Sequence, residues 1–459
     1  MSNQHHPSWR NDGVSSNRPF HLRGTHLYLM LDDIARTGPE DILKYIDSLI
    51  TTPPTVVESV FVKGAMSRNA GRIPDAVSLS VFQALSGLTR VQRWEVSGDG
   101  RFGGLYLPVQ AMTVALQHCP PNLLHLRLGN VILTSASPTA ALRCADMQSL
   151  AQSLRKLPRL TSIDLVRCRT EETIQQNHPE PAKMTLQPLV QAISSMSTLQ
   201  QAMFCETVIS GNTGLYLGEL CKSPSLQKLW WKTMPGMTDD HIVSMAACLM
   251  NSTRTSSLRE LTIRSHGLGA RAGYAIAELL RFNTTLQVIN LDLGQAAYGI
   301  PIAAALHHCN TTLQCLDVWA WGGELHSDSS RAITKVFTDM LEVNTSLKFL
   351  TFQGLDWTNP HIDYYLRLNR AERQRLVRDF ADRKVWVDTL IRQKEDVDVI
   401  FHFLSLNPSI LMRNGGTTSS RVPTKGSLPT QVSVSKRKDG PALLEQFTWN
   451  NKHAKRIIS

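Results

Sequence analysis

The 459-residue sequence has no long apolar run, no paired cysteine motif and no signal-like start. No apolar stretch approaches the ~18 residues that a membrane span needs. The N-terminus, residues 1–18, is polar and shows no apolar core before a cleavage site. We therefore expect a protein of the cytosol or the nucleus that makes no membrane contact.

Eight cysteines are present, but no two of them form a C-x-x-C pair, which argues against a structural zinc site. Without an export signal they are expected to be reduced thiols. Most are expected to pack as small apolar side chains. We expect neither a metal ion nor a cofactor, and the sequence shows no small-molecule substrate site.

Acidic residues are scarce at one end of the chain. Residues 411–459 contain nine basic and two acidic side chains, which accounts for +7 of the net charge of +10. The basic character therefore belongs mainly to the tail and says little about the rest of the protein. The run Lys436, Arg437 and Lys438 is a candidate nuclear-import or anion-binding patch, although a solvated tail is the simpler interpretation.

The dominant feature is a repeated pattern of three apolar residues, at the first, fourth and sixth positions of a six-residue segment. Ten copies occur between Val57 and Phe352, of which Leu258-Leu261-Ile263 and Leu286-Ile289-Leu291 are clear examples. The alternation within each copy is typical of a short strand with one buried face. Helical patterns lie between the strands. Examples are Gln110–His118, Met147–Leu157, Asp239–Met250, Arg271–Phe282 and Ser329–Val343.

Side chains with capping chemistry mark the ends of these helices. Asp239 and Asp328 lie where a helix N-cap is expected. Asn283, Asn310 and Asn344 end three helices in similar joints, and Asn tolerates the left-handed turn that often ends a helix. The same residues, with Asn251, match the letters of a glycosylation acceptor, which we interpret as a by-product of the joints.

A strand-plus-helix unit repeated with parallel strands predicts an α/β solenoid. The main alternative is an eight-stranded β/α barrel. Barrel strands are buried on both faces and read as continuous apolar runs. Here polar residues such as Arg127, Glu260 and Asp317 alternate with the apolar ones, and ten copies exceed eight strands.

The segments LRELTIRSHGLG, LQVINLDLGQ and LQCLDVWAWGG resemble the ribonuclease-inhibitor-like family of leucine-rich repeats. This resemblance implies a horseshoe with parallel strands on its concave face and helices on its convex face. The segment Ile362–Leu376 is similar to the one that closes repeat arrays in many uncharacterised microalgal leucine-rich-repeat proteins. The repeats here are unequal in length, and the Asn or Cys expected after each strand is clear only at Cys168.

The sequence predicts five regions. Residues 1–19 are a disordered leader, 20–56 an N-terminal cap, 57–360 a solenoid of about ten repeats, 361–412 a helical C-terminal cap and 413–459 a disordered basic tail. Two long loops, Leu133–Asp146 and Cys168–Met184, are expected insertions, and insertions in repeat proteins often lie on a binding face.

Two motifs resemble reactive or ligand-binding sites. Gly98–Gly103 matches the letters of a dinucleotide-binding loop, but Leu105–Pro108 intervene where a helix should open, so we expect an insertion loop. His307-His308-Cys309 resembles a metal site, but adjacent residues of a helix point in different directions. We expect a core cysteine beside two surface histidines, and no catalytic residues.

The residues between the apolar anchors should project from the open face of the strands. The central row is predicted to be Phe61, Glu95, Arg127, Asp164, Met203, Trp230, Thr262, Asn290, Asp317 and Thr351. An exposed Trp among charges resembles an interface anchor, although packing on a neighbour explains it equally well. The residues predicted to bind a protein partner are Met203, Lys228, Trp230, Lys232, Arg264, Asn290, Asp317 and Trp319.

This chemically mixed face favours a non-catalytic scaffold or sensor that binds a protein. It does not favour nucleic acid, since a nucleic-acid-binding face is expected to carry basic residues interleaved with aromatic ones, whereas the charges here are of both signs. Two alternatives stay open. One is a regulator of a small GTPase similar to Ran GTPase-activating proteins, although their acidic tail is replaced by a basic one and their catalytic arginine matches no position. The other is a substrate receptor for ubiquitin ligation, although residues 20–52 are short for an F-box and lack its Leu-Pro opening.

Overall fold

The computed structural model describes residues 20–406, except for the short gaps that follow. The gaps are residues 32–33, 35–37, 52–55, 65–73, 99–103, 119–120, 172–183, 210–214, 235, 252–255, 266–267, 321–326, 353–354, 356–358, 379–382 and 394. The chain divides into two units, one ending at Gln374 and the other starting at Arg375. The basic patch Lys436, Arg437 and Lys438 lies outside the described residues.

A twelve-stranded sheet runs through the first unit with its strands in chain order. All neighbours are parallel except the edge hairpin of β1 and β2. The strands are β1 (Phe20–Arg23), β2 (His26–Met30), β3 (Ser59–Gly64), β4 (Arg93–Gly98), β6 (His125–Gly129), β8 (Ser162–Val166), β10 (Gln201–Cys205), β11 (Lys228–Lys232), β12 (Glu260–Arg264), β13 (Val288–Leu293), β14 (Cys315–Ala320) and β15 (Phe349–Phe352).

All ten strands predicted from the repeat are present in this sheet, from β3 to β15. The strand order runs from β1 to β15 without closing, so the β/α barrel alternative is wrong. The hairpin of β1 and β2 was not predicted, although it lies in the region assigned to the N-terminal cap. It extends the sheet by two strands because Leu27 and Leu29 are buried in register with Val60 and Val62.

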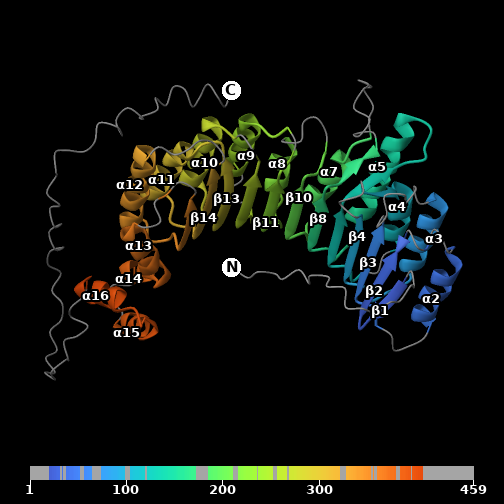
Figure 1. The fold of residues 1–459 in the computed structure, drawn as a ribbon, viewed down its shortest axis with the longest axis horizontal. Helices are drawn as coiled ribbons and strands as arrows, with labels where there is room; N and C mark the ends of the chain where they lie inside the picture. Colours follow the sequence, from blue (N-terminus) through green and yellow to red (C-terminus); the bar gives the residue numbers. More distant parts are fainter. Residues whose placement is uncertain are drawn as a thin grey trace, which may run out of the picture. The chain divides into compact units, whose positions relative to one another are not determined.

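Helices cover one face of the long sheet and leave the other face open (Figure 1). In the first unit they are α2 (Glu40–Thr51), α3 (Asp75–Leu85), α4 (Val109–Gln117), α5 (Ala140–Arg155), α7 (Gln187–Ser195), α8 (Leu215–Cys221), α9 (Asp239–Asn251), α10 (Ala270–Phe282), α11 (Ile300–His308), α12 (Ser327–Val343) and α13 (Pro360–Arg370). The apolar anchors of each strand, such as Leu229 and Trp231, are fully buried against these helices.

A second, three-stranded parallel sheet contains β5 (Leu105–Pro108), β7 (Val131–Thr134) and β9 (Arg169–Thr170). It was not predicted. Its strands follow β4, β6 and β8 in the chain, so two of them begin the segments expected to be insertion loops. The Leu133–Asp146 segment then ends in a capped helix, because Thr139 Oγ1 accepts the Leu142 N–H of α5 at 3.3 Å.

One residue after each of four successive strands adopts a left-handed conformation. These residues are Asn130, Arg167, Glu206 and Thr233, with φ between 48° and 53°. Each donates its backbone N–H to the last residue of the next strand in the sheet, as in the 2.7 Å bond from Arg167 to Cys205 O. The conformation is uncommon for residues other than Gly and Asn. Here the extra hydrogen bond between repeats offsets its cost.

Buried asparagines link the last repeats. Asn344 Nδ2 donates to Leu306 O at 2.8 Å and to Asn310 O at 2.9 Å in the preceding repeat. Its Oδ1 accepts the backbone N–H groups of Ser346 and Leu347 at 3.0 and 2.9 Å. Asn310 makes the same set of contacts one repeat earlier. We call this series, with Asn283 and Asn369, the asparagine ladder.

The ladder corrects the prediction that these asparagines provide left-handed turns. Asn283 has φ −81° and ψ 126°, which is extended, and none of the three predicted joints has positive φ. Their side chains are 2–5% exposed, so a glycan could not be attached to them in the folded chain. The amide side chain is selected because it can both donate and accept hydrogen bonds inside the core.

The segment that follows β15 closes the first unit with specific hydrogen bonds. Asn369 Nδ2 continues the ladder by donating to Asn344 O and Leu347 O at 2.9 and 2.8 Å. The Arg373 guanidinium donates to two carbonyls in the last turn of α12, and Gln374 Nε2 donates to Thr311 O at 3.2 Å. This segment therefore satisfies backbone groups that another repeat would otherwise satisfy.

Two further predictions need correction. Helix α9 begins at Asp239 itself, and its carboxylate accepts the Gly269 N–H at 2.6 Å, so it binds the start of the next helix and is not the N-cap. Helix α12 begins at Ser327, one residue before Asp328. Helix α14 (Arg373–Arg378) spans the boundary between the two units. The second unit also contains α15 (Arg383–Arg392) and α16 (Val397–Leu406), and Trp386 packs edge-on against Phe403.

Replacing Asn344 with Ala should lower the free energy of unfolding by roughly 3 kcal/mol or more, because it leaves several buried backbone groups without partners. Asn251→Ala, at the exposed end of α9, is the control and should change it by less than about 0.5 kcal/mol. Urea unfolding followed by circular dichroism measures both. Equal effects of the two substitutions would contradict the ladder's role.

Candidate functional site

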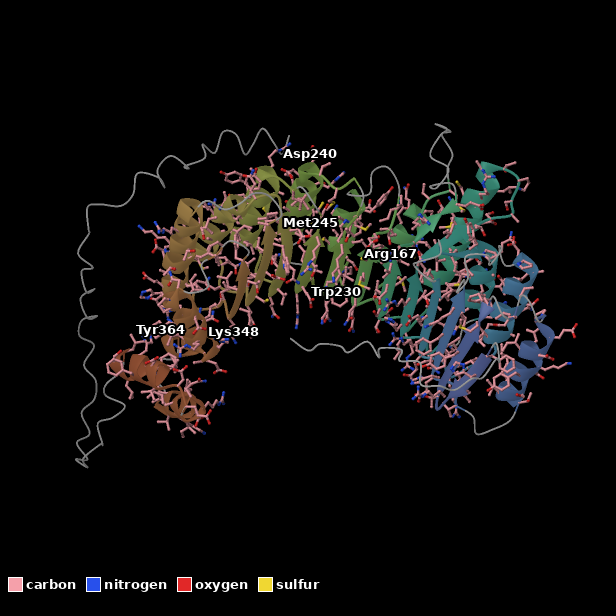
Figure 2. The ribbon with its side chains drawn as sticks, in the orientation of Figure 1. Arg167, Trp230, Asp240, Met245, Lys348 and Tyr364 are labelled. Atoms are coloured by element: carbon pink, nitrogen blue, oxygen red, sulfur yellow. The ribbon has the colours of Figure 1, made fainter. Side chains whose placement is uncertain are left out.

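The open face of the sheet carries the row that the repeat predicted. The strand register aligns Asp164 with Met203, Met203 with Trp230, Trp230 with Thr262, and so on in both directions from Phe61 to Thr351. Parallel strands without a register shift place equivalent residues side by side, about 4.8 Å apart. Figure 2 shows Trp230 on the side of the sheet away from α9, which carries Asp240 and Met245.

Trp230 lies in the middle of this row and is half-buried. Its indole Nε1 donates to Glu260 Oε1 at 2.7 Å. The ammonium of Lys232 lies 5.7 Å from the centre of its ring, and Lys228 forms a 3.4 Å ion pair with the second oxygen of Glu260. The expectation of an exposed Trp230 is therefore only partly met, because its neighbours hold the indole in place.

Trp319 is more accessible, with 40% of its surface exposed. The Arg264 guanidinium lies 5.4 Å from the centre of its ring and also approaches Asp317 Oδ2 at 3.3 Å. Such a cation–aromatic contact holds the indole in a fixed orientation while leaving part of the ring accessible. Both tryptophans thus combine packing on a neighbour with access from the open face.

Asn290 and Met203 complete the predicted set. Asn290 Nδ2 donates to Thr262 Oγ1 at 2.8 Å, which joins two strands between the tryptophans. Met203 is half-buried between Asp164 and Trp230 in the register. All eight predicted residues lie on β10 to β14 and share the open face, although their role in binding stays a prediction.

Sequence reasoning missed an aromatic stack at the other end of the open face. The rings of His21, Tyr28 and Phe61 stack with centroid distances of 4.9 and 4.8 Å and interplanar angles of 12° and 11°. Arg93 covers the far side of the stack, 5.7 Å from the centre of the Phe61 ring. The alternation of Leu27, Tyr28 and Leu29 is the signal that could have revealed it.

Charged residues occupy the row between the aromatic stack and Met203. Burial raises the pKa of Asp164 to about 6, and burial with the nearby arginines lowers the pKa of His125 to about 4. Their side chains approach to 3.7 Å. Asp164 is mostly charged above about pH 6 and His125 mostly charged below about pH 4, so at no pH are both mostly charged. We therefore do not interpret this contact as an ion pair.

The other candidate motifs have structural explanations. A Cβ atom on Gly98 would come within 2.3 Å of Leu105 N and 2.6 Å of Asn130 O, so close backbone packing requires this glycine. Residues 99–103 lie outside the described part, and the chain continues into strand β5 before α4 opens. A phosphate-binding loop leads directly into a helix, which this loop does not.

The cysteines divide by burial. Burial raises the pKa of the Cys168 thiol to about 12, and its Sγ lies 3.2 Å from Leu128 O. Cys309, expected in the core, is exposed beside His307 and His308, because α11 ends at His308.

Among the described residues, no cluster of three or more His, Cys, Asp or Glu side chains could hold a metal ion. None of the described helices could cross a membrane.

A shallow hollow of about 420 Å³, lined largely by Ser, Thr and Gln residues, lies outside the open face, where several strands begin. Its hydroxyl groups bond to the backbone of the preceding repeat. Thr161, Thr198 and Ser225 donate to main-chain carbonyls at 3.0, 3.1 and 2.9 Å. These side chains therefore link neighbouring repeats, and we place the candidate site on the open face.

Comparisons with known proteins assign no family. No family model matches the chain, and no curated protein matches it. Actin-binding site 2 of leiomodin-1 is similar to 36% of this chain over 92% of its own length, with 19% identity and a TM-score of 0.30. A Bacteroides fragilis protein is similar to 62% of this chain over 74% of its own length, with 10% identity and a TM-score of 0.36. Neither likeness is close enough to carry an argument.

The buried carboxyl and imidazole should oppose each other in the pH dependence of stability. A raised Asp164 pKa means that stability is lost as pH rises from about 4 to 6, whereas a lowered His125 pKa means that stability is gained over about the same range. Asp164→Asn removes the first effect, so unfolding free energy should rise more steeply with pH than in the native sequence. His125→Gln removes the second effect, so unfolding free energy should rise less steeply with pH than in the native sequence.

Urea unfolding between pH 4 and pH 7 measures the three curves. The comparison needs only their slopes, so a uniform change in stability caused by either substitution does not affect it. Parallel curves for the native chain and both variants would show that neither group titrates with a shifted pKa.

Proposed function

We propose that this chain is a leucine-rich-repeat solenoid of the ribonuclease-inhibitor-like kind. In this proposal the strands line a concave face and the helices a convex one. Support comes from the repeat itself, from a long sheet that is parallel except at its edge hairpin and covered by helices on one face, and from the buried residues that link successive repeats.

We propose further that the open face is a non-catalytic binding surface for another protein, centred on β11 to β14. The observation that carries this proposal is Trp319, a large aromatic side chain that stays 40% exposed on the open face of β14, the second strand from the end of the sheet. Trp and Arg are the residues that most often anchor protein interfaces. Trp319 and Arg264 stand together here, with Trp230 and Lys232 as a second such pair.

Rigid side chains favour this function. Binding is stronger when the contacting groups lose little conformational freedom on association. The hydrogen bond from Trp230 to Glu260 and the contact between Arg264 and Trp319 hold the aromatic groups before a partner arrives. The sheet beneath them, which is hydrogen-bonded on both sides of β11, is also a rigid support.

The double substitution Trp230→Ala and Trp319→Ala should weaken partner binding by about 2 kcal/mol or more, because it removes both aromatic anchors. The immobilised full chain is incubated with cell extract, and retained proteins are identified by mass spectrometry. The proteins retained by the native chain should be depleted with the double variant.

Tyr274→Ala is the matched control, because Tyr274 lies on α10 and is also 40% exposed. It should retain the same proteins as the native chain. Circular dichroism should show that both variants stay folded. If the double variant retains the native set of proteins, the open face near the tryptophans is not the binding surface.

A further inference from the structure

Four aromatic residues of the open face share one arrangement, in which a cation lies over the ring. The pairs are Arg93 with Phe61, Lys232 with Trp230, Arg264 with Trp319 and Arg370 with Phe349, at 5.4 to 6.0 Å from the ring centres. A ring attracts a cation without neutralising it. A partner that approaches the aromatic groups therefore meets positive charge as well.

Three ion pairs of this face are asymmetric in their exposure, whereas in a fourth, between Arg127 and Glu95, the side chains are 23% and 18% exposed. The Arg93 side chain is 44% exposed and that of its partner Glu95 is 18% exposed. The corresponding values are 41% and 21% for Lys228 and Glu260, and 37% and 18% for Arg264 and Asp317. In these three pairs the cation is about twice as accessible as the carboxylate.

The carboxylates are also occupied. Glu260 accepts the Trp230 indole N–H through one oxygen and pairs with Lys228 through the other. Lys232, by contrast, has no ion-pair partner within the described part of the chain, and its closest charged neighbour in the register is Arg264 on the adjacent strand. Like charges at paired positions of a sheet reduce stability. Asp317 offsets part of the Arg264 charge, so the remaining cost is small, and a bound anion beside Lys232 would recover it.

We infer that the open face binds an acidic segment of a partner protein, with carboxylates of the partner placed at Lys232 and Arg264. The inference rests on the proposed function and names the chemistry of the partner. Carboxylates of Asp or Glu complement the accessible cations, while neighbouring apolar side chains of the segment contact the exposed part of Trp319. Complementary charge also speeds the encounter of the two proteins.

A nucleic acid fits this face less well than an acidic protein segment. Binding to a phosphate backbone depends on many cations that together replace its counterions. Here three carboxylates, those of Glu95, Glu260 and Asp317, lie between the cations on the open face. A protein segment can place single carboxylates where the cations are, whereas a continuous phosphate chain must also pass the acidic positions.

The test uses the full chain and three labelled probes, and measures binding by fluorescence anisotropy at low and high salt. The probes are a peptide of repeated Glu-Ser-Glu-Leu, a matched peptide of repeated Lys-Ser-Lys-Leu, and a single-stranded oligothymidylate. We expect the Glu peptide to bind best, and its affinity to fall as salt screens the charges. Equal or tighter binding of either other probe would overturn the inference.

Substitutions locate the binding. Lys232→Gln and Arg264→Gln should each weaken binding of the Glu peptide about tenfold, which corresponds to about 1.4 kcal/mol. Lys232→Arg should retain it. The control is Arg271→Gln on α10, whose guanidinium pairs with Asp240 on α9 and should have no effect. Unchanged binding by Lys232→Gln would overturn the assignment of this residue.

A second measurement separates a binding role from a structural one. Because Lys232 lies beside Arg264, Lys232→Gln should leave the melting temperature unchanged or raise it while it weakens binding. A lysine retained for stability would instead give a lower melting temperature and unchanged binding. This outcome would contradict the inference.

Failure of the inference is distinguishable from failure of the proposed function. If the tryptophan double variant loses its captured proteins while Lys232→Gln and Arg264→Gln retain them, the open face binds a protein but not through acidic groups. If the tryptophan variant loses nothing, the proposed function itself is wrong, whatever the peptides do.

Discussion

The structure depends on one constraint, which is that each strand must pair in register with strands from the two neighbouring repeats. A single strand and helix cannot bury an apolar face alone, so each repeat needs its neighbours. The unshifted register from β2 to β15 lets the apolar anchors form a continuous core against the helices. The same register leaves every second side chain on a face that the helices do not cover, and this face holds the candidate site.

The regions between the strands are stabilised by hydrogen bonds that pass from one repeat to the next. The left-handed residues that follow β6, β8, β10 and β11 donate to the next strand, and the asparagine ladder links the later repeats at their helix ends. The helices do not satisfy the polar backbone groups of the turns. These hydrogen bonds do, and without them burial would leave those groups without partners. They also explain why repeats of unequal length keep a regular sheet. Insertions such as β7 and β9 follow the paired strand in the chain and pair in a separate sheet.

The candidate site combines a regular support with irregular chemistry. The main-chain register positions the row, but nothing in the repeat requires Trp230, Lys232 or Trp319, whose side chains lie on the open face. Adjacent like charges and an exposed indole are unfavourable for stability in an otherwise well-packed protein. Residues that reduce stability at one place on a regular scaffold are typical of function, and for this reason the open face, with its accessible cations, is the surface we assign to a partner.

The sequence by itself determined the repeat, the ten strands from β3 to β15 and the order of the row on the open face, because period-two burial and helix periodicity are local properties of the chain. It did not determine the structural role of Asn283, Asn310 and Asn344. Asparagine is suited both to a left-handed turn and to a buried hydrogen-bonded ladder, and the carbonyls of the neighbouring repeat decide which of the two forms. Tertiary structure also decided which charges are accessible. Lys228 and Glu260 look equivalent in the sequence, yet the side chain of Lys228 is more exposed than that of Glu260. The carboxylate has two partners on β11, the indole N–H of Trp230 and the ammonium of Lys228, and these hold it close to the sheet. The Lys228 ammonium has only the carboxylate as its ion-pair partner among the described residues.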